Sequence, residues 1–255
     1  GFRVNSGEYK VMGLAPYASE KHAREVSEKL EEFIGLSSTN SLIFTNTDKY
    51  PNLSDTRGPD KLPWIEDLYK VALHTRFDTL CAGVQLFVEK TVLEWIQTAI
   101  ELTGVRKVLL SGGFFMNVKA NQLIAELPAV EYVNCFPSCG DETNAFGAAF
   151  LGHRDELHDR PKQQIEFRDF CIGPEATTDL ACAKSKYLDK VIFKELESAN
   201  TALVDLLCEG KIVARCSGRM EFGARALGNR SILASPDDPR VINTINRAIK
   251  MRDFW

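Results

Sequence analysis

The sequence lacks the short motifs by which most nucleotide-binding and metal-dependent enzymes are identified. It contains no GxxxxGKS/T phosphate loop, no GxGxxG after a strand, no HExxH and no GxSxG. Its four histidines include no pair four residues apart, which excludes a helical two-histidine metal site. We therefore expect no metal site built entirely from this chain.

Signals for membranes, secretion and nucleic acids are also absent. No apolar run approaches the roughly 18 residues of a membrane span, and there is no basic-then-apolar leader. The formal net charge of -4 argues against a general nucleic-acid binder. The seven cysteines are an odd number, and "CFPSC" is neither a CxxC redox pair nor a zinc knuckle. We expect a cytoplasmic protein with reduced thiols in its core and with no membrane or nucleic-acid partner.

The length and the two ends bound the architecture. With 255 residues, of which 44% are hydrophobic and 26% charged, the chain suits one large domain or two smaller ones. It begins without methionine at "GFRVNS" and stops at "KMRDFW", directly after a helical pattern. We interpret it as a fragment of a longer protein.

The first part of the chain alternates helical and strand patterns. Apolar residues recur at three- and four-residue steps from Phe77, and Gly104 predicts the end of that helix. A strand near 107–111 leads into paired glycines and a helix from Asn117, followed by the strand "AVEYVNCFP" and a further helix. This order predicts an α/β layered domain with the 107–111 strand at its centre. The segments before it are expected to be a loop and short strand (1–18), an amphipathic helix (20–34) and an irregular stretch (37–64).

The second part restarts the pattern after a linker at 158–178. "NTALVDLLCEGKIVARCSG" predicts a helix and a strand. "DDPRVINTINRAIK" predicts a helix with Asp238 as its N-cap and Pro239 in its first turn.

The segment "LLSGGFFMNVKAN" is a candidate ligand site. Gly112 and Gly113 bring bare backbone N–H groups to a helix start, where negative charge is favoured. Asn117 and Asn121, one turn apart, are both candidates to face that ligand. An equally good interpretation is a tight turn in which Asn117 is only an N-cap. In "PSCGDETNAFGAA", Asp141 is either a helix cap or a metal ligand, and its position alone favours the cap.

The segment "SGRMEFGARALGNRSILASP" combines three arginines with three glycines. Guanidinium groups match the oxygens of phosphates and carboxylates, and glycine allows close backbone approach. We predict an anion site in this segment, to which Arg225 and Arg230 contribute. The alternative is that these arginines pair with nearby carboxylates such as Glu221 and only hold the loop.

Five segments together resemble a known family. "GEYKVMGLAPY", "SGGFFMNVKAN", "PSCGDETNAFGAA", "GRMEFGARALGNRSILASP" and "INRAIKMRDFW" occur in the order and at about the spacing of the NodU/CmcH family of O-carbamoyltransferases. The resemblance covers nearly the whole chain and is weakest at 37–64 and 158–200. Ala224 and Thr143 depart from the family pattern, which affects loop stiffness more than chemistry.

The resemblance implies a fold and a domain organisation. Residues 1–157 are expected to be the second lobe of a transferase domain of the actin/sugar-kinase/Hsp70 type, and 158–190 a linker. Residues 191–255 are expected to be the beginning of a YrdC-like α/β domain. The first lobe, with two metal-binding histidines, and most of the last domain are then missing.

The resemblance also implies a reaction. In the family, carbamoyl phosphate and ATP give carbamoyl-adenylate and pyrophosphate, and the carbamoyl group passes to a hydroxyl of a sugar, antibiotic or nodulation-factor acceptor. Gly112, Gly113 and Asn117 match the nucleotide-contacting segment, and Asp141 matches a carboxylate that helps to hold the active-site Fe²⁺. Arg225, Arg230, Lys250 and Arg252 match the anion-binding beginning of the second domain, and we expect them to converge on one anion.

Two other functions remain open on the residues alone. The glycine pair after a strand also suits a small-molecule kinase of the same fold superfamily, but a kinase has no place for the arginine-glycine segment. A nucleotide-binding module without turnover is the third possibility, and the fragment by itself is expected to be inactive.

Overall fold

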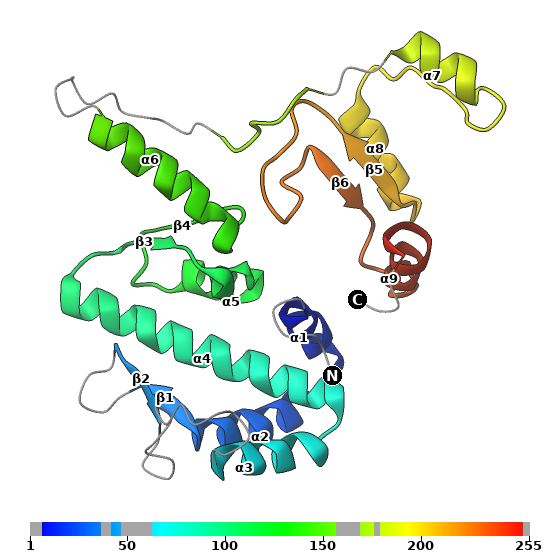
Figure 1. Ribbon diagram of the computed structural model, residues 1–255. Coiled ribbons are helices and arrows are strands. Elements are labelled where there is room, and N and C mark those ends of the chain that lie inside the picture. Colours follow the sequence, from blue (N-terminus) through cyan, green and yellow to red (C-terminus); the bar gives the residue numbers. More distant parts are fainter. Residues whose placement is uncertain (1–6, 37–41, 47–62, 157–168, 176–178, 252–255) are drawn as a thin grey trace. The chain divides into compact units, whose positions relative to one another are not determined.

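The computed structural model describes residues 7–36, 42–46, 63–156, 169–175 and 179–251 (Figure 1). The chain divides into two compact units, residues 1–142 and 143–255, and each is described by itself. Both units contain helices and small sheets, which confirms the α/β class. The boundaries predicted at residues 157 and 191 stay predictions.

The first unit is built around one long helix. Its elements are α1 (Glu8–Leu14), α2 (Glu20–Glu31), β1 (Ile34–Leu36), β2 (Phe44–Asn46), α3 (Pro63–Leu73), α4 (Phe77–Thr103), β3 (Lys107–Leu110), a 3₁₀ turn (Gly113–Met116), α5 (Val118–Glu126), β4 (Tyr132–Cys135) and the start of a 3₁₀ turn at Asp141–Thr143.

The helix α4 runs between β3, β4 and α5 on one side and α2 on the other (Figure 1). It ends as predicted, because Gly104 adopts the left-handed conformation (φ 70°) and its N–H bonds to the carbonyl of Ile100. The core joins apolar residues of α4, β3 and α5, namely Val92, Ile96, Ile100, Leu110, Ala120 and Ile124. The apolar residues whose periodicity predicted this helix therefore form the face of α4 that packs in the core.

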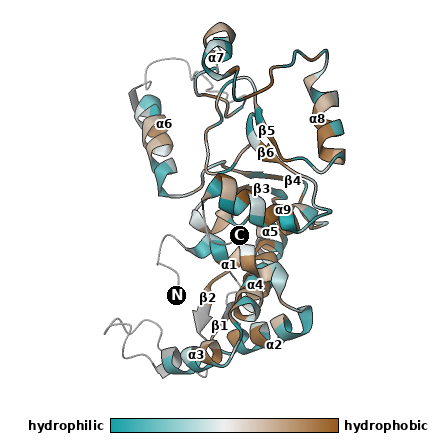
Figure 2. Ribbon diagram, turned by 90° about the vertical axis from the view of Figure 1, so that its right-hand side faces the viewer, coloured by the Kyte–Doolittle hydropathy of each residue, from teal (hydrophilic) through white to brown (hydrophobic). Residues whose placement is uncertain are grey.

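The helix α2 packs its apolar stripe on α4. Hydrophilic and hydrophobic residues alternate along α2 in Figure 2, and its buried residues include Ala23, Val26 and Leu30. Gly83 of α4 lies so close that a Cβ built on it would be 2.4 Å from Val26 Cβ. The helix ends at Glu31, before the predicted Ile34, which instead begins the two-stranded antiparallel sheet β1–β2.

The strands β3 and β4 pair in parallel, with Leu110 opposite Cys135. Both strands were predicted, and α5 begins after Asn117 as expected. In the described part of the chain β3 has β4 as its one partner, so the structure gives it no central place in a larger sheet.

The expectation of a loop and short strand at 1–18 is wrong for its described part. Glu8–Leu14 is a helix, and a 3₁₀ turn with proline in its first positions follows. A seven-residue helix is unstable in isolation, and this one is held by packing against α4. The stretch 37–64 also holds β2 and the beginning of α3, and its remainder lies outside the described residues.

The second unit contains α6 (Asn144–Glu156), α7 (Leu180–Tyr187), α8 (Ala199–Cys208), β5 (Val213–Cys216), β6 (Arg230–Leu233), α9 (Arg240–Thr244) and a π-helical turn (Ile245–Lys250). The strands β5 and β6 pair antiparallel. Pro239 is the N-cap of α9, one residue after the predicted cap, although the Asp238 carboxylate accepts a hydrogen bond from Arg240 N at 2.9 Å.

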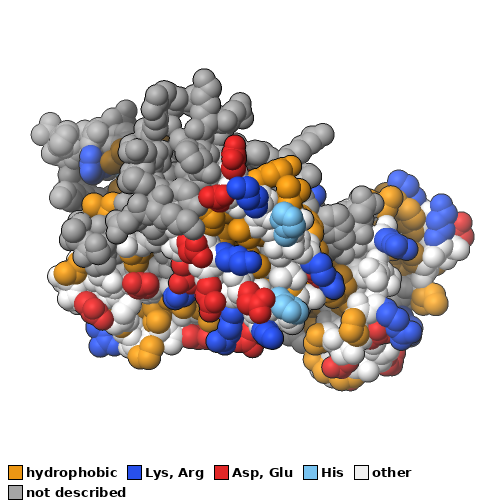
Figure 3. Space-filling model, turned by 90° about the horizontal axis from the view of Figure 1, so that it is seen from below, with side chains coloured by type: hydrophobic (Ala, Val, Ile, Leu, Met, Phe, Trp, Pro, Cys, Tyr) orange, Lys and Arg blue, Asp and Glu red, His pale blue; other side chains and the backbone are white. Residues whose placement is uncertain are grey.

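Acidic and basic side chains lie intermingled on the face of the molecule seen in Figure 3. On α2, for example, the guanidinium of Arg24 pairs with Glu20 one turn earlier. None of the helices in the described part of the chain has the length and apolar content needed to cross a bilayer.

Candidate functional site

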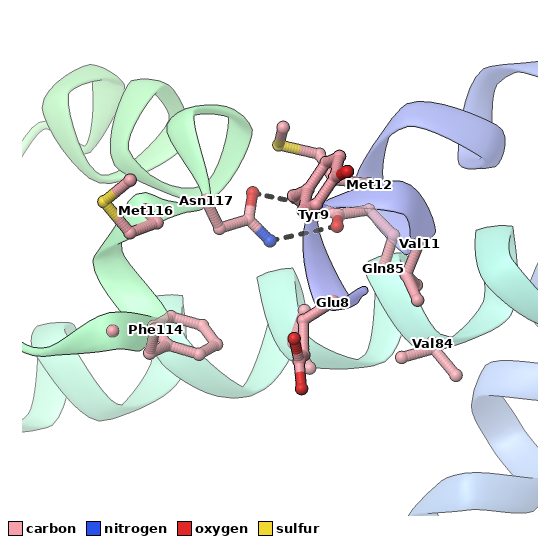
Figure 4. Close-up of a pocket in the computed structure, with 11 residues that line it drawn as sticks. Glu8, Tyr9, Val11, Met12, Val84, Gln85, Phe114, Met116 and Asn117 are labelled. Carbon is pink, nitrogen blue, oxygen red and sulfur yellow. Dashed lines mark hydrogen bonds between the residues drawn. The ribbon is translucent and has the colours of Figure 1, made fainter. Parts of the chain in front are cut away.

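A cavity of about 360 Å³ lies in the first unit where three segments meet (Figure 4). The lining comes from α1, from the first half of α4 and from the turn after β3. Most of it is apolar, with a few polar side chains from α1, α4 and the turn. Its residues are Glu8, Tyr9, Val11, Met12, Val84, Gln85, Val88, Gly113, Phe114, Met116 and Asn117. Two of the predicted site residues, Gly113 and Asn117, are therefore in its wall.

Gly112 and Gly113 have different structural roles. Gly112 adopts φ 106° and ψ 151°, a conformation essentially restricted to glycine, and it turns the chain out of β3. Gly113 has no positive φ, and a Cβ added to it would meet no heavy atom within 4 Å. Gly113 therefore leaves open space beside the cavity, whereas Gly112 shapes the backbone.

Asn117 combines the two interpretations that the sequence left open. Its Oδ1 caps α5 by accepting a hydrogen bond from Ala120 N at 3.1 Å, and its side chain also lines the cavity. The amides of Asn117 and Gln85 face each other and share two hydrogen bonds (Figure 4).

Asn121, the other candidate, does not line this cavity. Its Nδ2 donates to the carbonyl of Phe115 at 2.7 Å and to the sulfur of Cys135 at 3.3 Å, so it braces the turn after β3.

A second cavity of about 410 Å³ lies beside the first and shares Val88 and Phe114 with it. Its lining is otherwise apolar apart from the Thr91 hydroxyl, which donates to the carbonyl of Phe87. Trp95 lines it and has its Nε1–H bonded to the carbonyl of Leu42. Of these two cavities, the first therefore offers more polar side chains to a ligand.

Asp141 begins the 3₁₀ turn after β4 and is exposed. Because β3 and β4 are parallel, this turn and the Gly112–Gly113 turn follow the same edge of the sheet. Asp141 is not in the lining of the first cavity. Across the described ranges, no three His, Cys, Asp or Glu residues form a group that could hold a metal.

None of the seven cysteines is joined to another by a disulfide in the structure. Cys135 and Cys139 have their sulfurs 4.0 Å apart, and burial, helped by Cys139, raises the pKa of Cys135 to about 11. The expectation that the thiols are mostly core residues is only partly correct, because Cys182, Cys208 and Cys216 are exposed. These three lie on elements of the second unit, where helices and strands bury little.

The arginine-glycine segment contains the connection between β5 and β6 and then β6 itself, which begins at Arg230. Its three glycines all have positive φ: 55° at Gly218, 136° at Gly223 and 117° at Gly228. Residues with a Cβ rarely adopt these angles, so the glycines are needed to let the loop turn. This explains their presence without requiring a ligand.

A carboxylate organises this loop. Glu221 Oε1 accepts hydrogen bonds from the backbone N–H groups of Leu227, Asn229 and Arg230 at 3.1, 2.7 and 3.0 Å. These bonds, the one from Arg230 foremost, lower the pKa of Glu221 to about 2. Glu221 therefore accepts hydrogen bonds from backbone N–H groups, whereas the alternative interpretation of the sequence paired it with arginine side chains.

The arginine side chains also bind backbone. Arg230 Nη1 donates to the carbonyls of Ser217 and Asn229, and Nη2 donates to that of Gly218. Arg219 donates to the carbonyls of Ile172 and Gly173. Some of the guanidinium N–H donors in this segment are thus used to hold the loop together.

The other predicted cations are placed only in part. Arg225 is half-buried in the loop, and Lys250 is exposed at the end of the π-helical turn. Arg252 lies outside the described residues. Their convergence on one anion stays a prediction.

One functional candidate, Gln85, was missed from the sequence, and Glu221 was named there but given the wrong partners. Gln85 interrupts the apolar periodicity of the 77–103 helix, and a polar residue on the buried face of a helix is the signal that identifies it. Glu221 carried no comparable signal, because its partners are backbone groups six to nine residues away.

Comparison with known proteins adds a family to this geometry. A sequence model described as Carbamoyltransferase N-terminus matches residues 1–150, and one described as Carbamoyltransferase C-terminus matches residues 204–255.

Several relatives match nearly the whole chain. Nodulation protein NolNO of Sinorhizobium fredii is 27% identical over 251 residues, covering 97% of this chain and 35% of that protein. Nodulation protein NolO of Bradyrhizobium diazoefficiens is 28% identical over 254 residues, covering 97% and 43%. An uncharacterized protein of Synechocystis is 29% identical over 276 residues, covering 100% and 42%. The chain spans less than half the length of these curated relatives. By the match of the N-terminal model to more than half of its residues, the chain belongs to the carbamoyltransferase family.

Proposed function

We propose that this chain is part of an O-carbamoyltransferase that activates a carbamoyl group as its adenylate and transfers it to a small-molecule hydroxyl. One observation beyond family membership carries the proposal. The segments "GEYKVMGLAPY" and "SGGFFMNVKAN", far apart in the sequence, line one cavity of about 360 Å³. A cavity of this size holds a small organic ligand.

The proposed reaction consumes carbamoyl phosphate and ATP. ATP supplies the adenylyl group and releases pyrophosphate, so the phosphate of carbamoyl phosphate leaves as inorganic phosphate and one water is consumed. The acceptor oxygen then attacks the carbamoyl carbon, the bond to the AMP oxygen breaks, and the hydroxyl proton passes to a base. The acceptor is a hydroxyl of a sugar, antibiotic or nodulation-factor type of compound.

We assign the nucleotide to the first cavity. The backbone at Gly113 allows close approach because no Cβ occupies the open space beside it. Asn117 and Gln85 supply amide groups in a mostly apolar lining, which suits a base better than a triphosphate.

We assign phosphate binding to the basic residues of the second unit, Arg225, Arg230, Lys250 and Arg252. Arg230 has capacity for an anion, since its Nε–H and one Nη2–H make no hydrogen bond within the described ranges. Several fixed cations offset the repulsion between two phosphate compounds. The Glu221 carboxylate holds the loop that carries Arg225 and Arg230.

The family resemblance also implies an Fe²⁺ ion near Asp141. The described residues do not fit such an ion by themselves, because Asp141 is not part of any group of three potential ligands there. We therefore place no reaction step on a metal in this chain. The greater length of the relatives is consistent with further ligands and domains elsewhere in the protein.

The test is ATP–pyrophosphate exchange that depends on carbamoyl phosphate, measured in the complete gene product that contains residues 1–255. Gly113→Val fills the open space beside the cavity and should abolish ATP binding and exchange. Arg225→Ala should weaken carbamoyl phosphate binding or exchange about tenfold or more, as expected when one charge-assisted contact is lost.

Matched changes separate the site from general damage. Gly35→Val adds the same side chain to a strand position where a Cβ also meets nothing within 4 Å. Arg24→Ala removes an exposed arginine of α2. Both should leave exchange unchanged. A protein that phosphorylates its acceptor from ATP without carbamoyl phosphate would be a kinase, and one that binds ATP without any exchange would be a binding module.

A further inference from the structure

We infer that Gln85 and Asn117 together form the edge that reads the adenine base in the first cavity. The edge pairs an N–H donor with a carbonyl acceptor, which matches the 6-amino group and N7 of adenine; at the same edge a 6-oxo purine offers two acceptors, O6 and N7. This inference rests on the proposed nucleotide role of the cavity.

The geometry is a reciprocal amide pair. Gln85 Nε2 donates to Asn117 Oδ1 at 3.1 Å, and Asn117 Nδ2 donates to Gln85 Oε1 at 2.9 Å. The two residues are 32 positions apart and come from α4 and from the cap of α5. Gln85 is only 6% exposed, so its amide has little access to bulk water.

Neighbouring groups determine which way each amide points. The N–H of Ala120 requires an acceptor, which places Asn117 Oδ1 toward α5. The carboxylate of Glu89 requires a donor, and Gln85 Nε2 donates to it at 2.8 Å. Both constraints give the same orientation of the pair.

A count of donors and acceptors then shows what is left for a ligand. Both hydrogens of Gln85 Nε2 are used, by Glu89 and by Asn117. Asn117 Oδ1 accepts twice, from Gln85 and from Ala120. Within the described part of the chain, one hydrogen on Asn117 Nδ2 and one lone pair on Gln85 Oε1 remain.

These two remaining groups belong to the same edge of the pair. In a planar amide pair, the outer hydrogen of one nitrogen lies beside the outer lone pair of the oxygen that this nitrogen bonds. Glu89 and Ala120 occupy the opposite edge. Both amides line the cavity, so the edge left for a ligand offers a donor next to an acceptor.

The surroundings favour a flat, uncharged group over a phosphate. Tyr9 and Phe114 line the cavity and are 42% and 44% exposed, which leaves ring surface for a base. The Glu8 carboxylate in the lining disfavours an anion. The N6–N7 edge of adenine offers an amino donor beside a ring-nitrogen acceptor and complements the amide edge, as in recognition of adenine by Asn or Gln.

The experiment compares ATP with ITP, whose purine carries an oxygen in place of the amino group. Dissociation constants are measured by calorimetry in the complete gene product. The unchanged protein should bind ATP about 5- to 150-fold more tightly than ITP, the fold-change of a bidentate pair. Gln85→Met keeps the side-chain volume, removes the amide and should bring this ratio close to one.

The ratio remains informative if Gln85→Met loses stability, because the folded fraction affects both dissociation constants equally. The matched control is Gln97→Met on the same helix, where Gln97 donates to Glu101 as Gln85 does to Glu89, outside the cavity. It should leave the ratio unchanged.

Two outcomes overturn the inference. One is an ATP-to-ITP ratio that Gln85→Met does not change, in a protein that still shows carbamoyl-phosphate-dependent exchange. The other is that Gln85→Met abolishes the binding of carbamoyl phosphate but leaves the binding of acetyl phosphate unchanged. That result would assign the edge to the carbamoyl group instead of the adenine base. If the unchanged protein shows no carbamoyl-phosphate-dependent exchange, that result counts against the proposed function instead.

Discussion

Gly83→Ala tests the close crossing of α2 and α4. Gly83 lies on α4, two residues before Gln85. In an exposed helix this change is favourable by about 1 kcal/mol, because alanine is the better helix former. Here the added Cβ would lie 2.4 Å from both Cβ and Cγ1 of Val26 and 3.1 Å from the carbonyl oxygen of Ala23. The first two distances lie 1.0 Å below even the lower end of the 3.4–4 Å range of ordinary contact.

The magnitude follows from these opposing effects. Val26 Cβ is attached directly to the backbone and cannot rotate away, so α2 itself must shift. Overpacking of this kind costs about 1–3 kcal/mol, and the rigid contact places it near the upper end. After the gain in helix propensity, we expect the free energy of unfolding to fall by about 2 kcal/mol and the melting temperature by about 4–8 °C.

The assay is urea and thermal unfolding followed by circular dichroism, with Gly152→Ala as the control. Gly152 lies in α6, where an added Cβ meets nothing within 4 Å, so that change should stabilise by about 0.5–1 kcal/mol. Combining Gly83→Ala with Val26→Gly should destabilise less than the sum of the two single changes, by about 0.5–3 kcal/mol. Stabilisation by Gly83→Ala equal to that of the control would refute the close crossing of α2 and α4.

Two further predictions concern titrating groups. Because its folded pKa is lowered to about 2, Glu221 contributes stability above its ordinary pKa of 4.5, and this contribution is lost as the pH falls through about 2. The Glu221→Gln variant should therefore have a lower melting temperature than the unchanged chain at neutral pH. This difference in melting temperature should shrink as the solution is acidified below pH 4.5. A pH-independent difference, or the same effect from the control Glu25→Gln on α2, would contradict this. Alkylation by iodoacetamide at mildly alkaline pH, followed by mass spectrometry, should modify the exposed cysteines of the second unit first and Cys81 and Cys135 late, because burial raises the pKa of both thiols to about 11. Rapid modification of Cys135 would show that the turn after β4 opens in solution.

Several features could be predicted from the sequence because their causes are local. The 77–103 helix follows from its three- and four-residue periodicity and from the left-handed conformation that Gly104 adopts. The strands β3 and β4 are short apolar runs between turn residues, and Asn117 is followed by a helix that its own side chain caps. The family, too, was recognisable from five segments, and the match of the family models confirms it.

The helix α1 could not be predicted in this way. Its seven residues include a glycine and have no side-chain cap, so local propensity favours a loop. The packing of α1 against α4 stabilises it, and this contact joins residues about 75 positions apart. The same contact brings "GEYKVMGLAPY" to the cavity.

The partners of the polar side chains were decided by the tertiary structure alone. The sequence shows that Arg230 and Glu221 are charged, and a charge by its nature suggests an opposite charge or an ionic ligand. In the folded loop both bind backbone groups, because positive φ at three glycines turns the N–H and carbonyl groups toward them. Gln85 and Asn117 likewise meet only when α5 packs on α4. Periodicity and capping depend on residues within one or two turns, whereas hydrogen-bond partners depend on which distant segments share a surface.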